Sequence, residues 1–268
     1  IQVHAVNADA QGILDLQHLK ELLNQFPGAL VSLMHGNNEI GNINPVEEIS
    51  LICQEHNAYF HCDMVQTIGH FPHNLQSLPI HFATGSAHKF HGPKGVGFLY
   101  INPEVQIPPL NYGGAQERNM RGGTENVAGI IGMSKALELA ITFQEKHKSH
   151  IMSLKKYMIE EFTNQIQDIK FNGLSSALEK SLYTVLNVSL PPTEDNDMLL
   201  FNLDINQISA SAGSACSSGT NVASHVLSAL NADHSRGAVR FSFSKYNTKE
   251  EVSYVVQKLA EIYQMKPV

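Results

Sequence analysis

Strand-like and helix-like segments alternate along the first hundred residues, and this alternation constrains the fold more than any other feature. Apolar runs of strand length occupy residues 29–34, 58–63, 81–86 and 97–101, and residues 1–6 also have strand character. Helical patterns separate several of these runs. The sequence therefore predicts an α/β fold with a large, mostly parallel sheet and helices on both faces.

Two of the intervening helices carry start signals. Asp15 can cap a helix with a leucine-rich apolar face, and Asn44 followed by Pro45 resembles a cap and a first helical residue. The second helix is expected to bury Ile49, Ile52 and Cys53. Polar residues follow the strands, so we expect a ligand site at the carboxyl ends of the sheet strands.

The second half of the chain has a different pattern. Residues 126–169 keep helical apolar spacing with a break in the 140s, and strands are predicted over 183–190 and 239–244. A last helix starts at Thr248, whose capping box is completed by Glu251. We predict a large sheet domain over 1–140, incomplete at its N-terminus, and a smaller α+β domain over 141–268.

Composition narrows the function classes. The 268 residues are 43% hydrophobic and 16% charged, and the net charge is −7. A sequence-independent nucleic-acid surface needs clustered lysine and arginine, so we expect no nucleic-acid partner. No apolar run reaches the roughly 18 residues of a membrane span. The chain opens at Ile1 with no signal-peptide pattern, and we expect it to begin within a domain.

Cysteine and histidine usage argues against metal and disulfide sites. The three cysteines, Cys53, Cys62 and Cys216, have no short spacing. Free thiols fit a reducing compartment, so we predict a cytoplasmic protein. Two histidine pairs at a separation of three have no third ligand in a zinc pattern, and we predict no metal. The pairs are His70 with His73 and His88 with His91.

Residues 85–95 hold a lysine just past a strand end. A lysine in that position can be desolvated, which lowers its pKa and makes its amine nucleophilic. Lys89 is therefore a candidate for a Schiff base with pyridoxal phosphate (PLP), and Ser86 and His88 can bond a phosphate. Spacing alone also fits a solvated loop lysine. No Walker A phosphate loop is present.

Residues 61–66 place Asp63 at another strand end, 26 residues before Lys89. A carboxylate there could keep the pyridine nitrogen of PLP protonated, and Gln66 could bond the ring oxygen or the phosphate side. Taken alone, Asp63 fits an aspartate that caps a turn better than a cofactor ligand.

Residues 211–219 are small and polar throughout, which is typical of an exposed loop. A thiol in such a loop is accessible and can react as a thiolate, so Cys216 is a candidate nucleophile. Cys53 and Cys62 lie on a predicted apolar helix face and within a predicted strand, and both are expected to be buried.

Six motifs, in order over nearly the whole chain, resemble the NifS/IscS-like cysteine desulfurases of the class V aminotransferase family. They lie at residues 34–41, 61–66, 86–89, 113–118, 121–126 and 211–216. The resemblance implies a PLP-dependent transferase of fold type I. It covers the family without its N-terminal third, which holds a second phosphate-binding stretch and a histidine that stacks on the cofactor.

The resemblance also implies a role for each matching residue. Lys89 would carry PLP covalently, Asp63 would pair with its ring nitrogen, and Ser86 and His88 would bind its phosphate. Asn38 and Gln66 would bond the ring oxygen, and Thr124 would reach the phosphate of the partner subunit in a homodimer. Arg240 would bind the carboxylate of L-cysteine, with Asn38 beside the substrate. Cys216 would take the sulfur as a persulfide, leaving L-alanine.

The implied activity supplies sulfur to an acceptor protein for iron–sulfur clusters or tRNA thiolation. Two alternatives stay open from sequence. One is a relative acting on selenocysteine or cysteine sulfinate, or an aminotransferase of the same fold. The small-residue loop around Cys216 favours the desulfurase, because transamination needs no thiol. The other is a truncated, non-catalytic subunit.

Overall fold

The chain forms two compact units in the computed structural model, which describes residues 1–193, 196–212 and 224–264. The β1–β4 unit comprises residues 23–35 and 45–144, and the β5–β7 unit comprises residues 1–22, 36–44 and 145–268. The predicted domains were 1–140 and 141–268, so the structure places two N-terminal segments with the C-terminal residues. Hydrogen bonds explain this grouping. Asn42 Nδ2 donates to Gln11 O (2.7 Å), and Asn187 Nδ2 donates to Glu39 O (3.0 Å).

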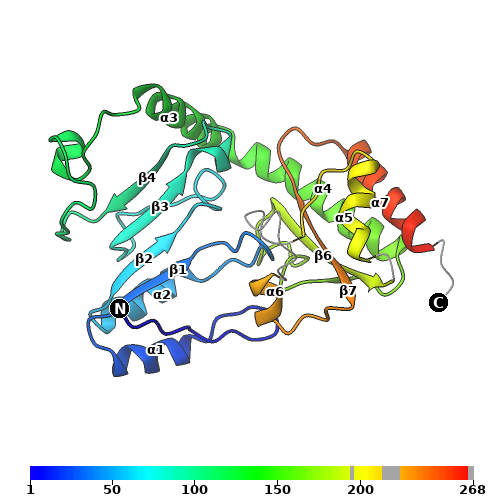
Figure 1. The fold of residues 1–268 in the computed structure, drawn as a ribbon, viewed down its shortest axis with the longest axis horizontal. Coiled ribbons are helices and arrows are strands. Elements are labelled where there is room, and N and C mark those ends of the chain that lie inside the picture. Colours follow the sequence, from blue (N-terminus) through cyan, green and yellow to red (C-terminus); the bar gives the residue numbers. More distant parts are fainter. Residues whose placement is uncertain (194–195, 213–223, 265–268) are drawn as a thin grey trace. The chain divides into compact units, whose positions relative to one another are not determined.

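The β1–β4 unit is built on a four-stranded sheet in the order β1-β2-β3-β4 (Figure 1). Its strands are β1 (Leu30–Met34), β2 (Tyr59–Asp63), β3 (Phe82–Ser86) and β4 (Gly97–Ile101). The first three are parallel, and β4 is antiparallel to β3. The predicted mostly parallel sheet of an α/β fold is therefore confirmed.

The helices of this unit include α2 (Val46–Glu55), α3 (Val127–Thr142) and two 3-10 turns, η1 (Ala87–Phe90) and η2 (Gln116–Asn119). Helix α2 packs against β2 and buries Ile49, Ile52 and Cys53, as predicted. Its cap differs from the prediction: Pro45 is the cap residue and the helix begins at Val46. Proline cannot donate a backbone hydrogen bond, so either position suits it.

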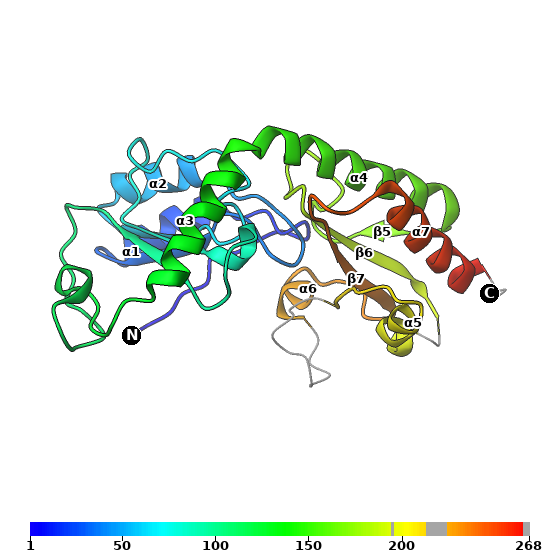
Figure 2. The same ribbon diagram turned by 90° about the horizontal axis from the view of Figure 1, so that it is seen from above.

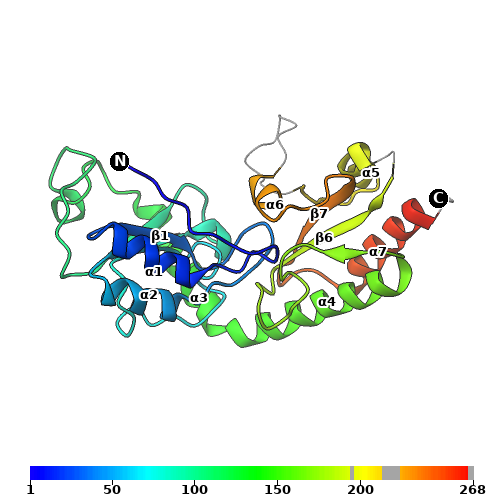
Figure 3. The ribbon, with the colours of Figure 1, turned by 90° about the horizontal axis from the view of Figure 1, so that it is seen from below.

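The β5–β7 unit contains a three-stranded antiparallel sheet in the order β5-β6-β7. Its strands are β5 (Lys170–Phe171), β6 (Val185–Pro192) and β7 (Arg236–Ser242). Its helices are α4 (Gln144–Gln165), η3 (Asn196–Met198), α5 (Leu199–Ile205), α6 (His225–Ala229) and α7 (Lys249–Gln264). Figures 2 and 3 show α4 and α7 on one side of the sheet and α6 on the other. The Phe162 and Phe241 rings, 5.8 Å apart, join α4 to β7.

The start signals of two helices work as the sequence predicts. Asp15 Oδ1 accepts from His18 N (3.0 Å) at the start of α1 (Leu16–Gln25). The capping box of α7 is complete, because Thr248 N donates to Glu251 Oε2 (3.0 Å) and Glu251 N donates to Thr248 Oγ1 (3.2 Å). A cap of this kind stabilises a helix by about 1 kcal/mol.

Residues 1–6 form no strand, in contrast to the prediction, and the Ile1 and Val3 side chains are exposed. An alternating pattern specifies a strand only where a neighbouring strand pairs with it. The segment instead continues into a turn, where Asp15 N donates to Asn7 O (2.8 Å).

No single helix among the described residues is long and apolar enough to cross a membrane. Helices α3 and α4 pass that test only as a pair, on length and composition, with a break between them.

A lysine lies in the core of the β5–β7 unit. The Lys155 side chain on α4 is fully buried, and its Nζ donates to Ser181 Oγ and Leu182 O, both at 2.8 Å. Burial disfavours the charged ammonium and lowers the pKa of Lys155 from 10.5 to about 7. The unit therefore contains a buried group that titrates near neutral pH.

This titration makes stability depend on pH. Between pH 7 and 10.5 the unfolded chain binds more protons than the folded chain, so the Lys155 contribution to unfolding free energy rises with pH. From pH 7 to pH 9 that contribution gains about 2 kcal/mol, and below pH 7 the full penalty applies. Urea denaturation at both pH values should show this gain in the wild type but not in Lys155→Met. Exposed Lys156→Met is the matched control, and an equal gain in Lys155→Met would contradict the assignment.

Candidate functional site

The candidate cofactor residues of the β1–β4 unit lie at one edge of the sheet. Asp63 is the last residue of β2 and Ser86 the last of β3, and the parallel register pairs Asp63 with Thr84. Lys89 and His88 follow Ser86 within η1. The structure thus brings together four predicted residues at the carboxyl ends of two adjacent strands, where α/β sheets bind ligands.

Asp63 is half-buried and oriented by the turn that follows β2. Its Oδ1 accepts from Val65 N (2.9 Å), so the carboxylate caps the turn, and Oδ2 is available to a further donor. The same turn carries half-buried Gln66. Both sequence interpretations of Asp63 are therefore compatible, because one oxygen serves the turn and the other can serve a ligand.

Ser86 and His88 form a contact pair. Ser86 Oγ lies 2.8 Å from His88 Nδ1, and the His88 side chain is exposed. The strand that ends at Ser86 packs closely against the Phe98 ring of β4. A Cβ on Gly85 would lie 2.4 Å from Phe98 Cε1. Only glycine fits there without moving the ring, which fixes the strand end that presents Ser86.

Lys89 projects from a short turn anchored on both sides. Ala87 and Phe90 are buried, and His70 Nε2 donates to the Lys89 carbonyl oxygen (2.9 Å). The turn ends at His91, whose left-handed φ is 66°, and Gly92 N donates to Ala87 O (2.8 Å). The neighbours of Lys89 are anchored, but the Lys89 side chain itself is exposed. This differs from the prediction that its amine is desolvated.

Thr124 lies apart from this cluster in sequence, in the segment between η2 and α3, and its side chain is exposed. The segment folds on itself: Gly122 N donates to Asn111 O (2.9 Å), and Gly123 N donates to Gln116 Oε1 (3.1 Å). An exposed threonine suits the predicted contact with a partner subunit, which stays a prediction.

Asn38 and Arg240, the predicted substrate residues, belong to the β5–β7 unit and contact one another. Arg240 Nη1 donates to the Asn38 carbonyl oxygen at 2.9 Å. Arg240 also pairs with Ser211 through backbone hydrogen bonds in both directions. Cys216 lies outside the described residues, five positions after Ser211. The described chain before Cys216 is therefore anchored at Arg240.

Glu39 is a functional candidate that sequence reasoning missed, although it lies within the motif at 34–41. Its side chain is 1% exposed, and Ser224 Oγ donates to its Oε2. Ser224 also caps α6, because its Oγ accepts from Leu227 N (3.1 Å). The described chain is therefore held on both sides of residues 213–223. Ser211 pairs with Arg240 before them, and Ser224 contacts Glu39, the neighbour of Asn38, after them. The sequence signal for this contact was Ser224, a possible helix cap three residues before Leu227.

Removing this anchor should destabilise the unit. Ser224→Ala loses the α6 cap and leaves the buried Glu39 carboxylate without that donor, a cost of about 2–4 kcal/mol in unfolding free energy. Exposed Ser228 on the same helix provides the control, since Ser228→Ala should change stability by less than about 0.5 kcal/mol. Urea denaturation compares the two, and equal effects would contradict the anchoring role.

The other cysteines and histidines have structural surroundings. Cys53 and Cys62 are buried, as predicted, and burial raises their thiol pKa values to about 11 and about 12. The His35 and His73 rings lie 5.2 Å apart, and burial lowers the pKa of His35 to about 4. Within the described part of the chain, no group of three or more metal-ligating side chains occurs.

The chemistry of the donor set fits PLP. A carboxylate with an available oxygen, a serine–histidine pair and an accessible primary amine gather at one sheet edge. These groups match a protonated ring nitrogen, a phosphate and an aldehyde in turn.

Comparison with known proteins agrees with this site. The family model of the class V aminotransferases matches residues 1–255. A cysteine desulfurase IscS of Dictyoglomus turgidum is 45% identical over 256 residues, which are 95% of this chain and 64% of the relative. One of Methanosarcina thermophila is 42% identical over 237 residues, 88% of this chain and 57% of the relative. The chain thus spans less than two thirds of the length of these relatives.

Solved structures give the same result. A NifS-like protein is 37% identical, with a TM-score of 0.86 over 99% of this chain and 69% of its own. A NifS-like protein from Rickettsia africae is 30% identical, with a TM-score of 0.86 over 97% of this chain and 69% of its own. With a family model that matches 255 of 268 residues, the chain belongs to the class V aminotransferase family.

Proposed function

We propose that the protein is a PLP-dependent cysteine desulfurase, which converts L-cysteine to L-alanine and keeps the sulfur as a persulfide on Cys216. The observation that carries the proposal is the gathering of Asp63, Ser86, His88 and Lys89 at one sheet edge. The relatives named cysteine desulfurases support it further.

Each residue has a task that its chemistry allows. The Lys89 amine would hold PLP covalently, Ser86 and His88 would bind its phosphate, and the Asp63 carboxylate would hold a proton at the ring nitrogen. The Asn38 and Gln66 amides would donate to the ring oxygen. When bound, PLP supplies an electron sink for bonds at the substrate α-carbon.

The substrate would be held in the β5–β7 unit. The Arg240 guanidinium can bind the L-cysteine carboxylate through two parallel hydrogen bonds, which fixes the orientation of the amino acid. The Cys216 thiolate would attack the substrate sulfur and form a sulfur–sulfur bond as the carbon–sulfur bond breaks. The electron pair of the broken bond would stay with the carbon skeleton, which gains a proton and leaves as alanine.

We propose a homodimer in which Thr124 reaches the phosphate in the partner's site, and a sulfur-acceptor protein that serves iron–sulfur cluster assembly or tRNA thiolation. The exposed side chain of Thr124 and the small, polar composition of the sequence around Cys216 support these proposals. We place the protein in the cytoplasm, where a free nucleophilic thiol stays reduced.

The test is an absorbance spectrum of the purified 268-residue chain with added PLP, recorded before and after L-cysteine. Alanine is quantified directly, and sulfur is quantified as the sulfide that dithiothreitol releases from the persulfide. We expect a near-visible band that shifts with L-cysteine and equal amounts of alanine and sulfur. L-Serine, which lacks the sulfur, is the matched control. Preferred turnover of selenocysteine or cysteine sulfinate would favour the related lyases, and a chain without a PLP band would fit the non-catalytic subunit.

A further inference from the structure

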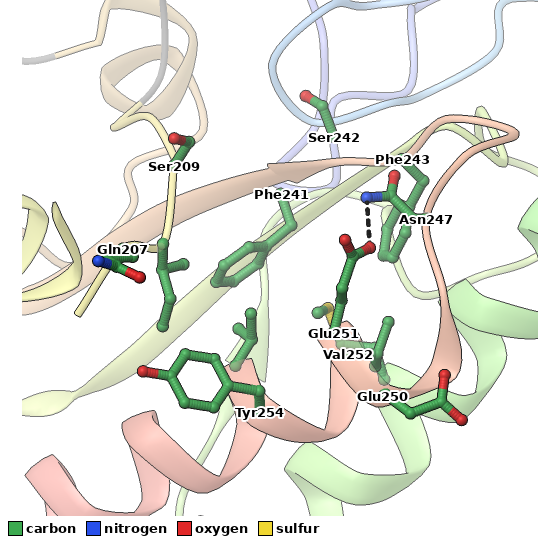
Figure 4. A pocket seen from close by; sticks show the side chains of 13 residues that line it. Gln207, Ser209, Phe241, Ser242, Phe243, Asn247, Glu250, Glu251, Val252 and Tyr254 are labelled. Carbon is green, nitrogen blue, oxygen red and sulfur yellow. Dashed lines mark hydrogen bonds between the residues drawn. The ribbon is translucent and has the colours of Figure 1, made fainter.

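A cavity of about 510 Å³ lies in the β5–β7 unit (Figure 4). Its lining residues do not include Arg240 or Asn38. Phe241 of β7 and Phe243, which directly follows the strand, form one apolar wall with Val252 and Val255 of α7. Residues 207–209 line it as well. In Figure 4 the Glu251 carboxylate lies between the rings of Phe241 and Phe243. The cavity thus combines an apolar surface with a carboxylate.

Ser242, which lines the cavity, is the last residue of β7. Arg240 N donates to Ser211 O (2.6 Å) and Ser211 N donates to Arg240 O (3.3 Å), on the side away from β6. Every second residue of a strand directs its backbone groups to the same side, so those of Ser242 also face outward. Phe243 N donates to Thr184 O on the opposite side, which agrees with this alternation.

The antiparallel register explains the gap. Continuing from the Ser211–Arg240 pair, Ser209 would stand opposite Ser242, but the bridge recorded between these described segments is confined to Ser211 and Arg240. Both serines line the cavity, and Ser242 is exposed. The outward N–H and C=O of Ser242 therefore belong to a residue that lines the cavity, where a backbone segment of another protein can bond to them.

The charge of the lining selects the occupant. Hydrogen bonds from the Asn247 side chain and the Thr248 N–H lower the pKa of Glu251, and backbone and Thr248 hydrogen bonds lower that of Glu250. Both carboxylates are ionised at neutral pH, and the lining contains no lysine or arginine. The neighbouring lysines have other contacts: Lys249 lies over the Tyr157 ring, and Lys258 pairs with Glu261.

We propose that this edge of β7 binds an extended segment of another protein, which pairs with the Ser242 backbone and places a lysine or arginine side chain across Phe241 and Phe243 toward Glu251. The segment would pair with β7 at Ser242, because Arg240 already pairs with Ser211 and Ser244 N donates to Asn247 Oδ1. Its basic side chain would cover the rings with its aliphatic stem and meet the carboxylate with its charged end.

The experiment uses the full 268-residue chain and a fluorescein-labelled peptide, acetyl-TVKVTV-amide, in a fluorescence-anisotropy titration. We expect saturable binding that weakens as salt is raised. Ser242→Pro removes the outward N–H and should weaken binding about tenfold, because a backbone hydrogen bond is lost. Proline is tolerated on an edge strand, and circular dichroism checks the fold. Ser242→Ala keeps the backbone and should bind as the wild type does.

The charge is tested separately with Glu251→Gln, which preserves the capping box. That variant should lose several-fold in affinity for the lysine peptide and none for a peptide with norleucine in place of lysine. Unchanged binding to Ser242→Pro, or no saturation at millimolar peptide, would overturn the proposal. Sedimentation showing a wild-type dimer that dissociates in Ser242→Pro would overturn it in favour of a second copy of this chain.

Discussion

Replacing Lys89 with alanine should abolish covalent attachment of PLP and lower desulfuration of L-cysteine by on the order of 10³-fold or more. The reason is that no other amine lies in η1, the turn that follows the strand end of Ser86. Borohydride treatment of the PLP-loaded wild type, followed by peptide mass analysis, should find the reduced adduct on Lys89. The variant should show no adduct and no near-visible band.

Lys94 provides the control for that experiment. It lies in the same segment, five residues on, and its side chain is also exposed. Lys94→Ala should keep the adduct on Lys89 and change turnover little. An adduct on Lys94 in the wild type, or equal losses in the two variants, would show that accessibility alone governs labelling and that the Lys89 assignment is wrong.

Local patterns predicted most of the fold. Apolar runs located β1 to β4, and the capping residues Asp15, Thr248 and Glu251 make the hydrogen bonds that their spacing indicated. These signals lie within one turn or one strand, so a single sequence contains them. Three features differ from the prediction: the domain bounds, residues 1–6 and the cap of α2. The first two depend on distant partners, and the third depends on an exact helix boundary.

Residues 1–22 and 36–44 show why distant partners escape sequence reasoning. Their place in the β5–β7 unit depends on Asn42 and on Asn187, which bond Gln11 O and Glu39 O across long stretches of chain. Nothing in the local pattern of these segments indicates such bonds. Strand character at residues 1–6 failed for a related reason, because pairing is decided elsewhere.

The candidate site divides in the same way. Strand-end position predicted that Asp63, Ser86 and Lys89 would gather at one edge, because parallel strands end together. The exposure of Lys89 and the burial of Glu39 beside Ser224 depend on tertiary packing, which spacing does not encode. The roles of Asn38, Thr124 and Arg240 came from the family resemblance alone, and those of Lys89, Asp63 and Cys216 also from residue chemistry. All of them remain predictions that mutation can test.

Replacing Cys216 with alanine should separate cofactor binding from sulfur transfer. The variant should keep the PLP band, because the proposed cofactor contacts come from Lys89 and its neighbours and not from the Cys216 thiol. It should lose the persulfide and lower desulfuration by on the order of 10³-fold, because the nucleophile that accepts the sulfur is gone. Mass analysis after L-cysteine treatment should find added sulfur on Cys216 in the wild type alone.

Cys53 and Cys62 supply the matched controls. Both thiols are buried, and their raised pKa values keep them protonated at neutral pH, so neither can act as a thiolate acceptor. Cys53→Ala and Cys62→Ala should therefore leave the persulfide on Cys216, although each can cost stability by vacating core volume. Sulfur found on either buried cysteine, or unimpaired desulfuration by Cys216→Ala, would refute the role assigned to Cys216, since a thiolate is needed to receive the sulfur.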